Sequence, residues 1–302
     1  MDIRVLRYCE AVARLGNITR AAAELHVAQP ALSVAIRKLE EELGVTLFTR
    51  TRNRPVSLTP EGKLLMRRAA RLFHEFDSAR RELADAIGLR TGTVRVGMPP
   101  MYGIGYFPSL MKAFHAAHPG ITVTALEGSA GEIKSLLEDG KVDLAILEER
   151  RVQKGWAHAT LDEEEVVLCV RADHPLAKKT QVADRDLDDL PMILFEGSFL
   201  QRNVLEQRCQ KAGVKFRMVM QSNYVPMVHQ AVVDGLGAAT LLRSIVTADE
   251  RLTALSFEPQ ERFRFDLCWL DEHYLSKANE AFMNFAIAHR QSTAAPVVQD
   301  YL

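Results

Sequence analysis

The chain has 302 residues, of which 47% are hydrophobic and 25% are charged, as in ordinary soluble globular proteins. No apolar run approaches the roughly 18 residues that a membrane helix needs, and the first residues lack a signal-peptide pattern. We therefore expect a cytoplasmic protein of one small and one medium domain, with no membrane partner.

The net charge of −1 hides an uneven distribution along the chain. Residues 1–90 carry 16 Lys and Arg against 11 Asp and Glu, whereas the remaining residues carry 22 against 28. A basic N-terminal part followed by an acidic remainder is typical of a nucleic-acid-binding module joined to a domain that does not contact nucleic acid.

The first 45 residues predict three helices. Residues 2–15 form an opening helix that supports the next two. Asn17 is a suitable N-cap, because its side chain can accept a hydrogen bond from a free backbone N–H of the following helix. Residues 26–28 form a turn, and Gln29-Pro30 opens the third helix, where proline is tolerated in the first turn. Gly44 ends that helix, because glycine suits the left-handed backbone of a C-terminal cap.

The helix that begins at Gln29 has an apolar side and a polar side. Leu32, Ile36, Leu39 and Leu43 recur at helical spacing, so we expect them to face inward. The outward side carries mostly polar residues that could contact DNA: Gln29, Pro30, Ser33, Val34, Arg37 and Lys38. Two crossed helices of this kind match the helix-turn-helix motif, whose second helix enters the major groove.

Residues 47–58 predict a β-hairpin with a basic tip. Both ends favour β-strand, and Arg50, Arg52 and Arg54 occupy alternate positions of the tip. Arginines so placed suit the phosphate backbone or a narrow minor groove. The alternative is a small helical subdomain with a solvated basic loop, but helix, turn, helix and basic hairpin all occur in working order.

These features resemble the N-terminal domain of LysR-type transcriptional regulators from Leu6 to Leu58 without a gap. The resemblance is carried by Arg20-Ala21-Ala22, Leu25, Gln29-Pro30-Ala31-Leu32-Ser33, Ile36, Leu39-Glu40, Leu43-Gly44, Leu47-Phe48, Arg50, Leu58-Thr59 and Gly62. Ala28 departs from the family, which usually has serine before Gln-Pro, and this removes a possible cap or phosphate contact. The resemblance implies a winged helix-turn-helix domain at residues 1–58 that binds double-stranded DNA.

Residues 59–88 predict one long helix, which Thr59 caps and Pro60 opens. Apolar residues recur at alternating spacings of four and three, which is a heptad seam. We expect two chains to pair along it through Leu65, Leu72, Phe76, Ala79 and Leu83. The resemblance also implies a linker helix here, and the alternative is a helix packed on its own C-terminal domain.

From residue 92 onward, short apolar strands alternate with helices, which predicts parallel sheets with helices on both faces. The predicted fold class is therefore α/β with an all-α N-terminal part. Weaker similarity to the LysR family continues in residues 114–121, 137–146, 173–176 and 235–237. It implies an effector-binding domain at 92–302 that resembles type 2 periplasmic binding proteins, with lobe I at about 92–162 and 266–302 and lobe II at about 163–265.

Ligands of open α/β sheets bind beyond the carboxyl ends of the strands. The rule selects residues 99–102, 128–129, 147–148, 196–199, 201 and 222–223. Together with the resemblance it predicts an effector site that comprises Pro100, Met101, Ser129, Glu148, Ser198, Phe199, Gln201 and Asn223. The carboxylate of Glu148 disfavours a strongly anionic effector and indicates a hydroxylated, amino or neutral one, unless Arg150, Arg151 or Arg202 turns toward the site. Leu242 departs from the family, which commonly has proline there.

No catalytic constellation is evident in the sequence. Residues 103–105 and 235–237 are GxG fragments without the third glycine of a dinucleotide motif, and His115 and His118 have no third metal ligand nearby. The acidic run Asp162 to Glu165 is expected to be a solvated approach to a strand. We therefore expect no enzyme activity, no cofactor and no metal.

The four cysteines, Cys9, Cys169, Cys209 and Cys268, are scattered without a CxxC pair. This spacing indicates neither a zinc knuckle nor a disulfide framework. Cys169 and Cys268 are expected in the core, whereas Cys209 is expected to be exposed. A redox switch at Cys209 stays open, because some members of the resembled family sense peroxide.

The predicted function is that of a sequence-specific DNA-binding transcriptional regulator, modulated by a small molecule bound between the two lobes. A homodimer presents two recognition helices, so we expect an inverted-repeat promoter site. The family implies homotetramers of two dimers, and RNA polymerase is a further expected partner. The alternative is a small-molecule-binding protein or enzyme with a helical appendage.

Overall fold

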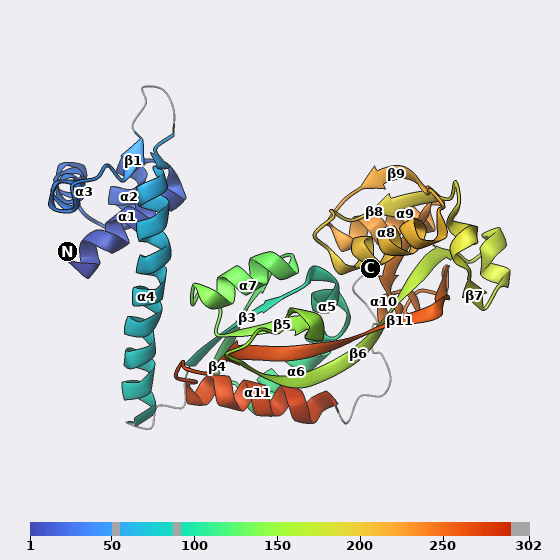
Figure 1. Cartoon of the computed structure of the whole chain (residues 1–302). Helices are drawn as coiled ribbons and strands as arrows, with labels where there is room; N and C mark the ends of the chain where they lie inside the picture. Colours follow the sequence, from blue (N-terminus) through green and yellow to red (C-terminus); the bar gives the residue numbers. More distant parts are fainter. Residues whose placement is uncertain (50–54, 87–91, 291–302) are drawn as a thin grey trace. The chain divides into compact units, whose positions relative to one another are not determined.

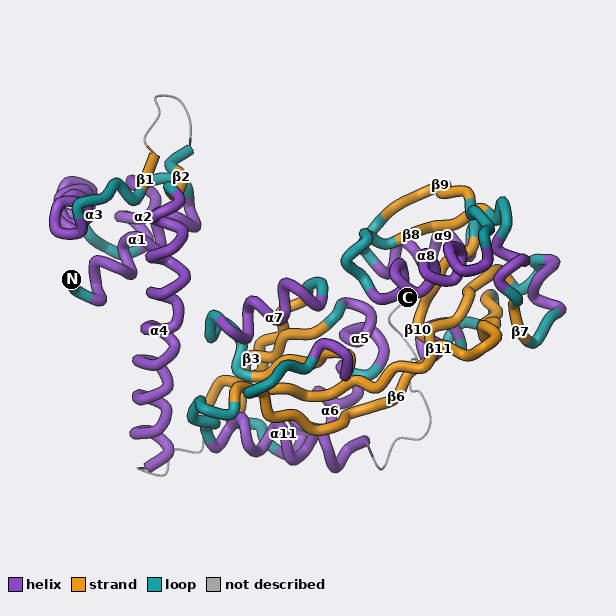
Figure 2. Tube along the Cα trace, in the orientation of Figure 1, coloured by secondary structure: helices purple, strands orange, loops and turns teal. Residues whose placement is uncertain are grey.

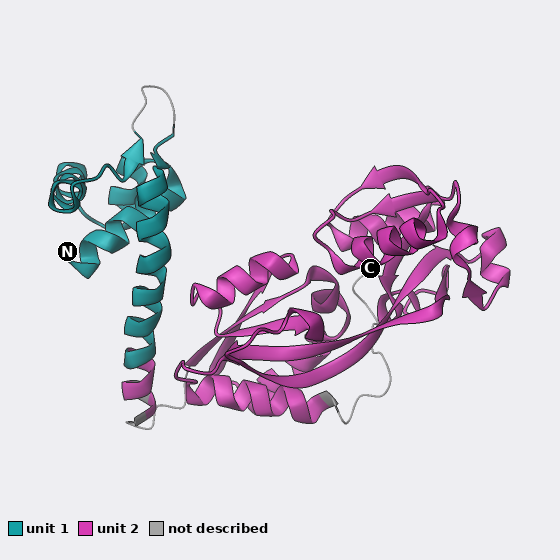
Figure 3. Cartoon of the chain, in the orientation of Figure 1, with its two compact units in different colours: residues 1–79 teal, residues 80–302 magenta. Residues whose placement is uncertain are grey.

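The computed structural model describes residues 1–49, 55–86 and 92–290. The chain divides into two compact units, Met1–Ala79 and Arg80–Leu302 (Figure 3). The first unit is helical with a two-stranded hairpin, and the second holds a nine-stranded mixed sheet with helices (Figure 2). The predicted fold class is confirmed, while the predicted domain boundaries stay a prediction.

The first unit contains three short helices, a small hairpin and most of a long helix: α1 (Ile3–Leu15), α2 (Ile18–Glu24), α3 (Gln29–Leu43), β1 (Phe48–Thr49), β2 (Ser57–Leu58) and α4 (Pro60–Ala86). These elements share a core of buried side chains that includes Leu6, Ile36, Phe48 and Phe73. Because α4 supplies Phe73 to this core, the long helix is part of the same packing as the helix-turn-helix.

The helix ends follow the local sequence signals. The Asn17 side chain accepts a hydrogen bond from the Arg20 N–H at 3.0 Å, and the Thr59 hydroxyl accepts one from the Gly62 N–H at 3.0 Å, so both predicted caps are confirmed. Gly44 is left-handed, with a φ of 67°. The prediction that Leu43 faces inward is wrong. Leu43 is exposed, because it is the last residue of α3 and lies beyond the core.

Gly62 marks a close approach between α4 and the segment before the hairpin. A Cβ at this position would lie 2.2 Å from the carbonyl oxygen of Leu47. Only glycine can therefore occupy position 62, in the first turn of α4, without displacing that backbone.

The second unit has two halves, which we call lobe I and lobe II. Lobe I contains β3 (Gly92–Met98), α5 (Pro100–Gly105), α6 (Phe107–Ala117), β4 (Ile121–Glu127), α7 (Ala130–Glu138), β5 (Leu144–Glu148), the 3-10 turn η1 (Glu149–Arg151) and α11 (Lys277–Arg290). Lobe II contains η2 (Pro175–Lys178), β7 (Gln181–Val182), η3 (Asp184–Leu187), β8 (Pro191–Leu194), α8 (Leu200–Ala212), β9 (Arg217–Gln221), α9 (Val225–Val233), β10 (Ala238–Leu242) and α10 (Arg243–Val246).

Two long antiparallel strands, β6 (Trp156–Arg171) and β11 (Leu252–Leu270), pass through both lobes (Figure 1). The strand order is β4-β3-β5-β11-β6-β10-β8-β9, with β7 beside β11. The parallel strands therefore lie on either side of a shared antiparallel pair, and the register of that pair shifts between Ser256 and Glu261.

The acidic run Asp162 to Glu165 is not a solvated approach to a strand, so that expectation is wrong. The run lies inside β6, where Glu163 is paired in register with Arg264 and Glu165 with Arg262 of β11. Arg262 also forms an ion pair with Glu163 at 3.3 Å. Opposite charges on neighbouring strands favour the pairing, and this complementarity joins segments about a hundred residues apart.

None of the described helices is long and apolar enough to cross a membrane.

Candidate DNA-binding face and effector pocket

The outward face of α3 is polar and accessible. Gln29, Pro30, Val34, Arg37 and Lys38 are exposed, and Ser33 is half-buried. The Gln29 amide donates a hydrogen bond to the Ser33 hydroxyl at 2.8 Å, which orients its side chain along the helix. Amide and hydroxyl groups at the start of a helix are the groups that read base edges in a major groove.

Glu40 holds the hairpin against α3, a role that could not be foreseen from the residue pattern. Its carboxylate accepts hydrogen bonds from the backbone N–H groups of Leu47 at 2.8 Å and Phe48 at 3.3 Å. These two donors lie at the start of β1, so the carboxylate fixes where the hairpin leaves the helix.

The ends of the predicted hairpin are present as β1 and β2, with Phe48 paired to Leu58 and Thr49 to Ser57. The basic tip that carries Arg50, Arg52 and Arg54 lies outside the described residues. Its contacts with DNA stay a prediction.

The predicted seam of α4 divides into two parts. Leu65 packs, half-buried, against the core of the first unit. Leu72, Phe76 and Leu83 are 49%, 51% and 70% exposed, and Ala79 is also exposed. An exposed apolar stripe of this length is unusual on a solvated helix, so Leu72 to Leu83 is the part of the seam that is free to pair.

The last turn of α4 belongs to the second unit and bonds to lobe I. The Asp85 carboxylate accepts hydrogen bonds from the Tyr274 hydroxyl at 2.9 Å and from the Lys277 N–H, at the start of α11, at 2.8 Å. Burial and this carboxylate raise the pKa of Tyr274 to about 12, so its hydroxyl remains a donor. The last turn of α4 is thus packed on the C-terminal domain, as the alternative interpretation expects. The apolar stripe from Leu72 to Leu83 is exposed.

A pocket lies between the lobes at the carboxyl ends of their strands. It is lined by Pro99, Met101, Tyr102, Ala130, Glu148, Phe199, Leu200, Gln201, Leu242 and Phe265. Glu148 ends β5, Leu242 ends β10 and Pro99 follows β3. The pocket therefore lies at the edge of each lobe that the strand-end rule selects.

Most of the wall is apolar, and its polar groups come from opposite lobes. Glu148 of lobe I pairs through Oε1 with the Arg151 Nε at 2.7 Å. Gln201 of lobe II donates its amide N–H to the sulfur of Met101 in lobe I, at 3.2 Å. The Leu242 N–H also points to that sulfur at 3.2 Å. The lobes are thus joined across the pocket by a Gln201–Met101 hydrogen bond.

Four of the eight predicted effector residues line the pocket: Met101, Glu148, Phe199 and Gln201. Ser129 does not, because its hydroxyl and N–H are both bonded to Glu132 at 2.8 Å, an interaction that lowers the pKa of that glutamate. The Asn223 side chain accepts from the Glu196 N–H at 3.0 Å. Pro100 and Ser198 are also absent from the lining, and the roles of all eight stay a prediction.

The strand-end rule also selected Pro99 and Tyr102, which line the pocket, but it did not select four other lining residues: Ala130, Leu200, Leu242 and Phe265. Leu242 was noticed only as a departure from the family. Phe265 carried no signal, because it reaches the pocket from the strand that passes through both lobes.

All four cysteines are buried. The expectation that Cys209 is exposed is wrong, because this residue faces the core from α8 and is 5% exposed. Burial raises the pKa of Cys209 to about 11 and that of Cys9, Cys169 and Cys268 to about 12. These thiols are protonated at neutral pH and are poor nucleophiles.

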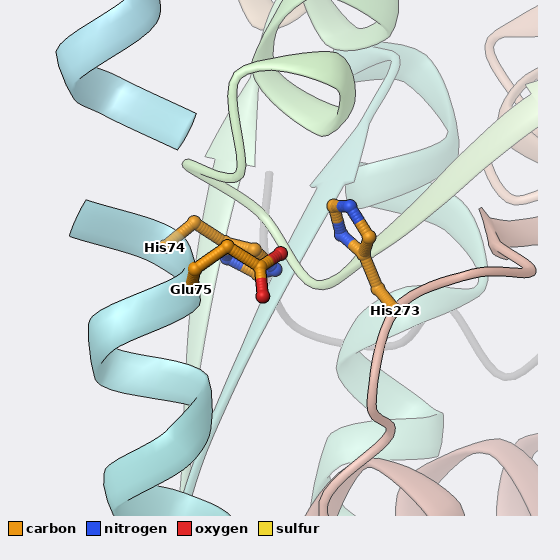
Figure 4. Close-up of side chains that lie close together, drawn as sticks. All are labelled: His74, Glu75 and His273. Atoms are coloured by element: carbon orange, nitrogen blue, oxygen red, sulfur yellow. The ribbon is translucent and has the colours of Figure 1, made fainter. Parts of the chain in front are cut away.

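Three potential metal-ligating side chains are His74 and Glu75 of α4 and His273, which follows β11 (Figure 4). Imidazole and carboxylate groups are common zinc ligands. Because His74 and Glu75 belong to the first unit and His273 to the second, we assign no metal ligands among them.

Two family models match the chain. Residues 3–63 match the bacterial regulatory helix-turn-helix protein, lysR family, and residues 88–291 match the LysR substrate binding domain. The first match contains α1, α2, α3 and the hairpin, and the second contains both lobes.

Curated relatives are similar over nearly their whole length. The chain is 30% identical to the uncharacterized HTH-type transcriptional regulator YwbI of Bacillus subtilis, over 94% of this chain and 95% of that protein. It is 31% identical to the hydrogen peroxide-inducible genes activator of Dickeya chrysanthemi, over 89% of this chain and 84% of that protein.

Solved structures show the same architecture. A full-length variant of OxyR from Pseudomonas aeruginosa matches with a TM-score of 0.74 and 25% identity, over 95% of this chain and 94% of that chain. Full-length CbnR in complex with its target DNA matches in fold with a TM-score of 0.70 and 20% identity, over 96% of this chain and 100% of that chain. The chain belongs to the LysR family of DNA-binding transcriptional regulators with an effector-binding domain.

Proposed function

We propose that this regulator reads DNA with the outward face of α3, pairs along α4, and receives its signal in the pocket between the lobes. The observation that carries the proposal is the exposed face of Gln29, Val34, Arg37 and Lys38 on a helix-turn-helix core. The partner is DNA, so we place the protein in the cytoplasm, as a regulator rather than an enzyme.

In this proposal Gln29, Pro30, Ser33 and Val34 face the bases, while the cations anchor the protein on the phosphates. Amides bond to adenine edges, and an aliphatic side chain suits the methyl group of thymine. Arg37 and Lys38 have the charge and exposure that phosphate contacts need. Arg50, Arg52 and Arg54 are proposed to extend those contacts from the hairpin.

Two copies paired through Leu72, Phe76, Ala79 and Leu83 would present two α3 helices, so the proposed site is an inverted repeat in a promoter. A homotetramer of two such dimers and contact with RNA polymerase are further parts of the proposal. A relative in fold, CbnR, is known in complex with its target DNA.

The pocket between the lobes is the proposed effector site. It unites one buried carboxylate, one buried amide and apolar walls from both lobes, the composition of a small-molecule site. A relative in fold, the regulatory domain of CcmR from Synechocystis, is known in complex with 2-PG; it matches with a TM-score of 0.62 and 21% identity, over 68% of this chain and 100% of that chain.

The test is enrichment of genomic fragments from the source organism on the purified full-length protein, followed by footprinting of the retained fragments. We expect a protected inverted repeat that binds at least about a thousandfold more tightly than random DNA at the same salt concentration. Equal retention of all fragments would contradict sequence-specific regulation.

A further inference from the structure

The outward face of α3 contains an exposed valine beside its polar groups. Val34 is 48% exposed and lies outside the core of the first unit. In the described parts of α1, α2 and α3, the other exposed large hydrophobic side chains, Ile3 and Leu43, lie at helix ends. Val34 lies in the interior of a helix, where valine is a weaker helix former than alanine or lysine. Neither packing nor helix propensity therefore accounts for this valine, and its side chain is available to a partner.

The neighbours of Val34 on the helix surface place it in the proposed DNA-binding face. Residues three and four positions apart share one side of a helix. Pro30 and Ala31 precede Val34 at these spacings. Arg37 and Lys38 follow it, and all four neighbours are exposed. The apolar side chains therefore lie in the N-terminal half of α3, the part of such a helix that contacts base edges, while the cations lie one turn further along.

Val34 differs from the polar residues beside it in the groups that it can contact. The Gln29 amide and the Ser33 hydroxyl, joined by a hydrogen bond of 2.8 Å, can both bond to base edges, whereas Val34 offers only methyl groups. In the major groove every base pair presents donors and acceptors, but only thymine presents an apolar group, its 5-methyl. A valine packed on a donor or acceptor would remove that group from water without a replacement bond, which is unfavourable. The 5-methyl group is therefore the complementary partner of Val34.

We propose that Val34 reads the 5-methyl group of one pyrimidine in each half-site of the inverted repeat, so that affinity depends on the methyl group itself. This inference rests on the proposed binding of DNA by α3 and specifies one base of the site. Thymine is the unmodified base that carries the group. 5-Methylcytosine carries the same group in the same groove, so at this position the regulator distinguishes a methylated cytosine from an unmethylated one.

The burial of one methyl group against an aliphatic side chain determines the size of the expected effect. Loss of one such contact weakens binding by about fourfold, the equivalent of burying one methyl-sized group. The two subunits of a dimer contact two half-sites, and well-separated positions contribute almost independently to the affinity. Loss of the methyl group from both half-sites therefore weakens binding by roughly fifteenfold.

Fluorescence anisotropy of the full-length protein on duplexes that contain the footprinted inverted repeat tests the methyl group directly. Each thymine of one half-site is replaced in turn by deoxyuridine, together with its symmetry-related thymine. This replacement removes the methyl group and leaves every hydrogen-bonding group of the base in place. We expect one pair of positions at which it weakens wild-type binding by roughly fifteenfold. A cytosine at these positions should bind more tightly when it is 5-methylated, by a similar factor.

Val34→Ala tests whether Val34 is the residue that contacts the methyl group. This variant should bind the thymine site more weakly by about the same factor, and the deoxyuridine replacement should then cause less than about a twofold further loss, because the contact is already absent. Alanine favours a helix, so the variant is expected to fold. Val45→Ala is the matched control, because it removes the same atoms from an exposed valine beyond the end of α3. It should keep the methyl sensitivity of the wild type.

The inference is overturned if no deoxyuridine replacement weakens wild-type binding by more than about twofold, or if Val34→Ala keeps the full methyl sensitivity. The first result needs no variant, so it decides even if Val34→Ala does not fold. The proposed function is judged separately. Specific binding that is insensitive to the methyl groups would preserve the function and reject the role of Val34, whereas equal binding to all DNA would reject both.

Discussion

The outward side chains of α3 differ in the bonds that they can form with DNA. The Gln29 amide can donate and accept, and its bond to Ser33 holds it at the start of the helix. Lys38 offers a single mobile charge one turn beyond Val34. The Gln29 amide can therefore distinguish bases, whereas a phosphate contact of Lys38 is insensitive to the DNA sequence.

We expect Gln29→Ala to cost about 1–3 kcal/mol on the preferred site and to relax the preference at one base pair in each half-site. Lys38→Ala should weaken binding to all sequences alike and reduce the salt dependence by about one unit of slope per subunit. Fluorescence anisotropy on specific and random DNA at several salt concentrations measures both. Equal losses on the two DNAs for Gln29→Ala would rule out its base-reading role.

The cysteines make a second prediction at this scale. Their pKa values of about 11 to 12 exceed the ordinary value near 8.5, because burial disfavours the thiolate. Above about pH 8.5 the unfolded chain loses thiol protons that the native chain keeps, so their contribution to stability is present below this pH and is lost as the pH rises toward 12.

We therefore expect native protein to react slowly with a thiol reagent at pH 8, all four cysteines to react after unfolding in urea, and the melting temperature to fall between pH 9 and 11. Hydrogen peroxide should leave DNA binding unchanged. Rapid loss of one thiol from the native protein would show that a cysteine becomes accessible, and would restore the redox interpretation.

At the scale of elements, the exposed stripe of α4 predicts how the chains associate. Phe76→Glu places a charge in the middle of the stripe and should convert the proposed dimer to a monomer, because burying an unpaired carboxylate costs several kcal/mol. Analytical ultracentrifugation measures the change. Arg71→Glu, on another side of the helix, adds negative charge outside the stripe and should leave the dimer intact. An unchanged Phe76→Glu dimer would exclude this seam.

Local signals predicted most of the elements. Asn17, Thr59 and Gly44 each act on neighbouring backbone groups, so their caps could be read directly from the sequence. The full extents of β6 and β11 could not be predicted from the sequence, because these strands pair charged residues, such as Glu163 and Arg264, that are far apart in the chain. The four consecutive acidic residues Asp162 to Glu165 have no hydrophobic alternation that would reveal this part of β6 as a strand.

The lining of the pocket could likewise be predicted only in part, because some of it depends on contacts between distant residues. The strand-end rule selected Glu148 and the start of α8, because both follow buried strands. It could not show that Ser129 would bond to Glu132 within its own helix, nor that Phe265 would reach the pocket from β11. Side-chain direction within a strand-end loop depends on packing that a single sequence does not display.

At the scale of the whole molecule, the two units have hydrophobic cores that share no residue. Calorimetry should therefore resolve two unfolding transitions, since each core is lost cooperatively. Ile36→Ala removes a fully buried side chain from the first core and should destabilise that transition by about 2–5 kcal/mol. The second transition should keep its midpoint. A shift of both by the same amount would show one cooperative unit.

The hydrogen bond between Gln201 and Met101 has a consequence for the concentration at which this regulator responds. If the closed pocket is favoured tenfold over the open one, the apparent affinity for any ligand falls by about the same factor. A substitution at Met101 should then shift the detection threshold, because it removes the acceptor of this hydrogen bond as well as part of the pocket wall. The range of signal concentrations that such a regulator detects is thus set in part by a single thioether.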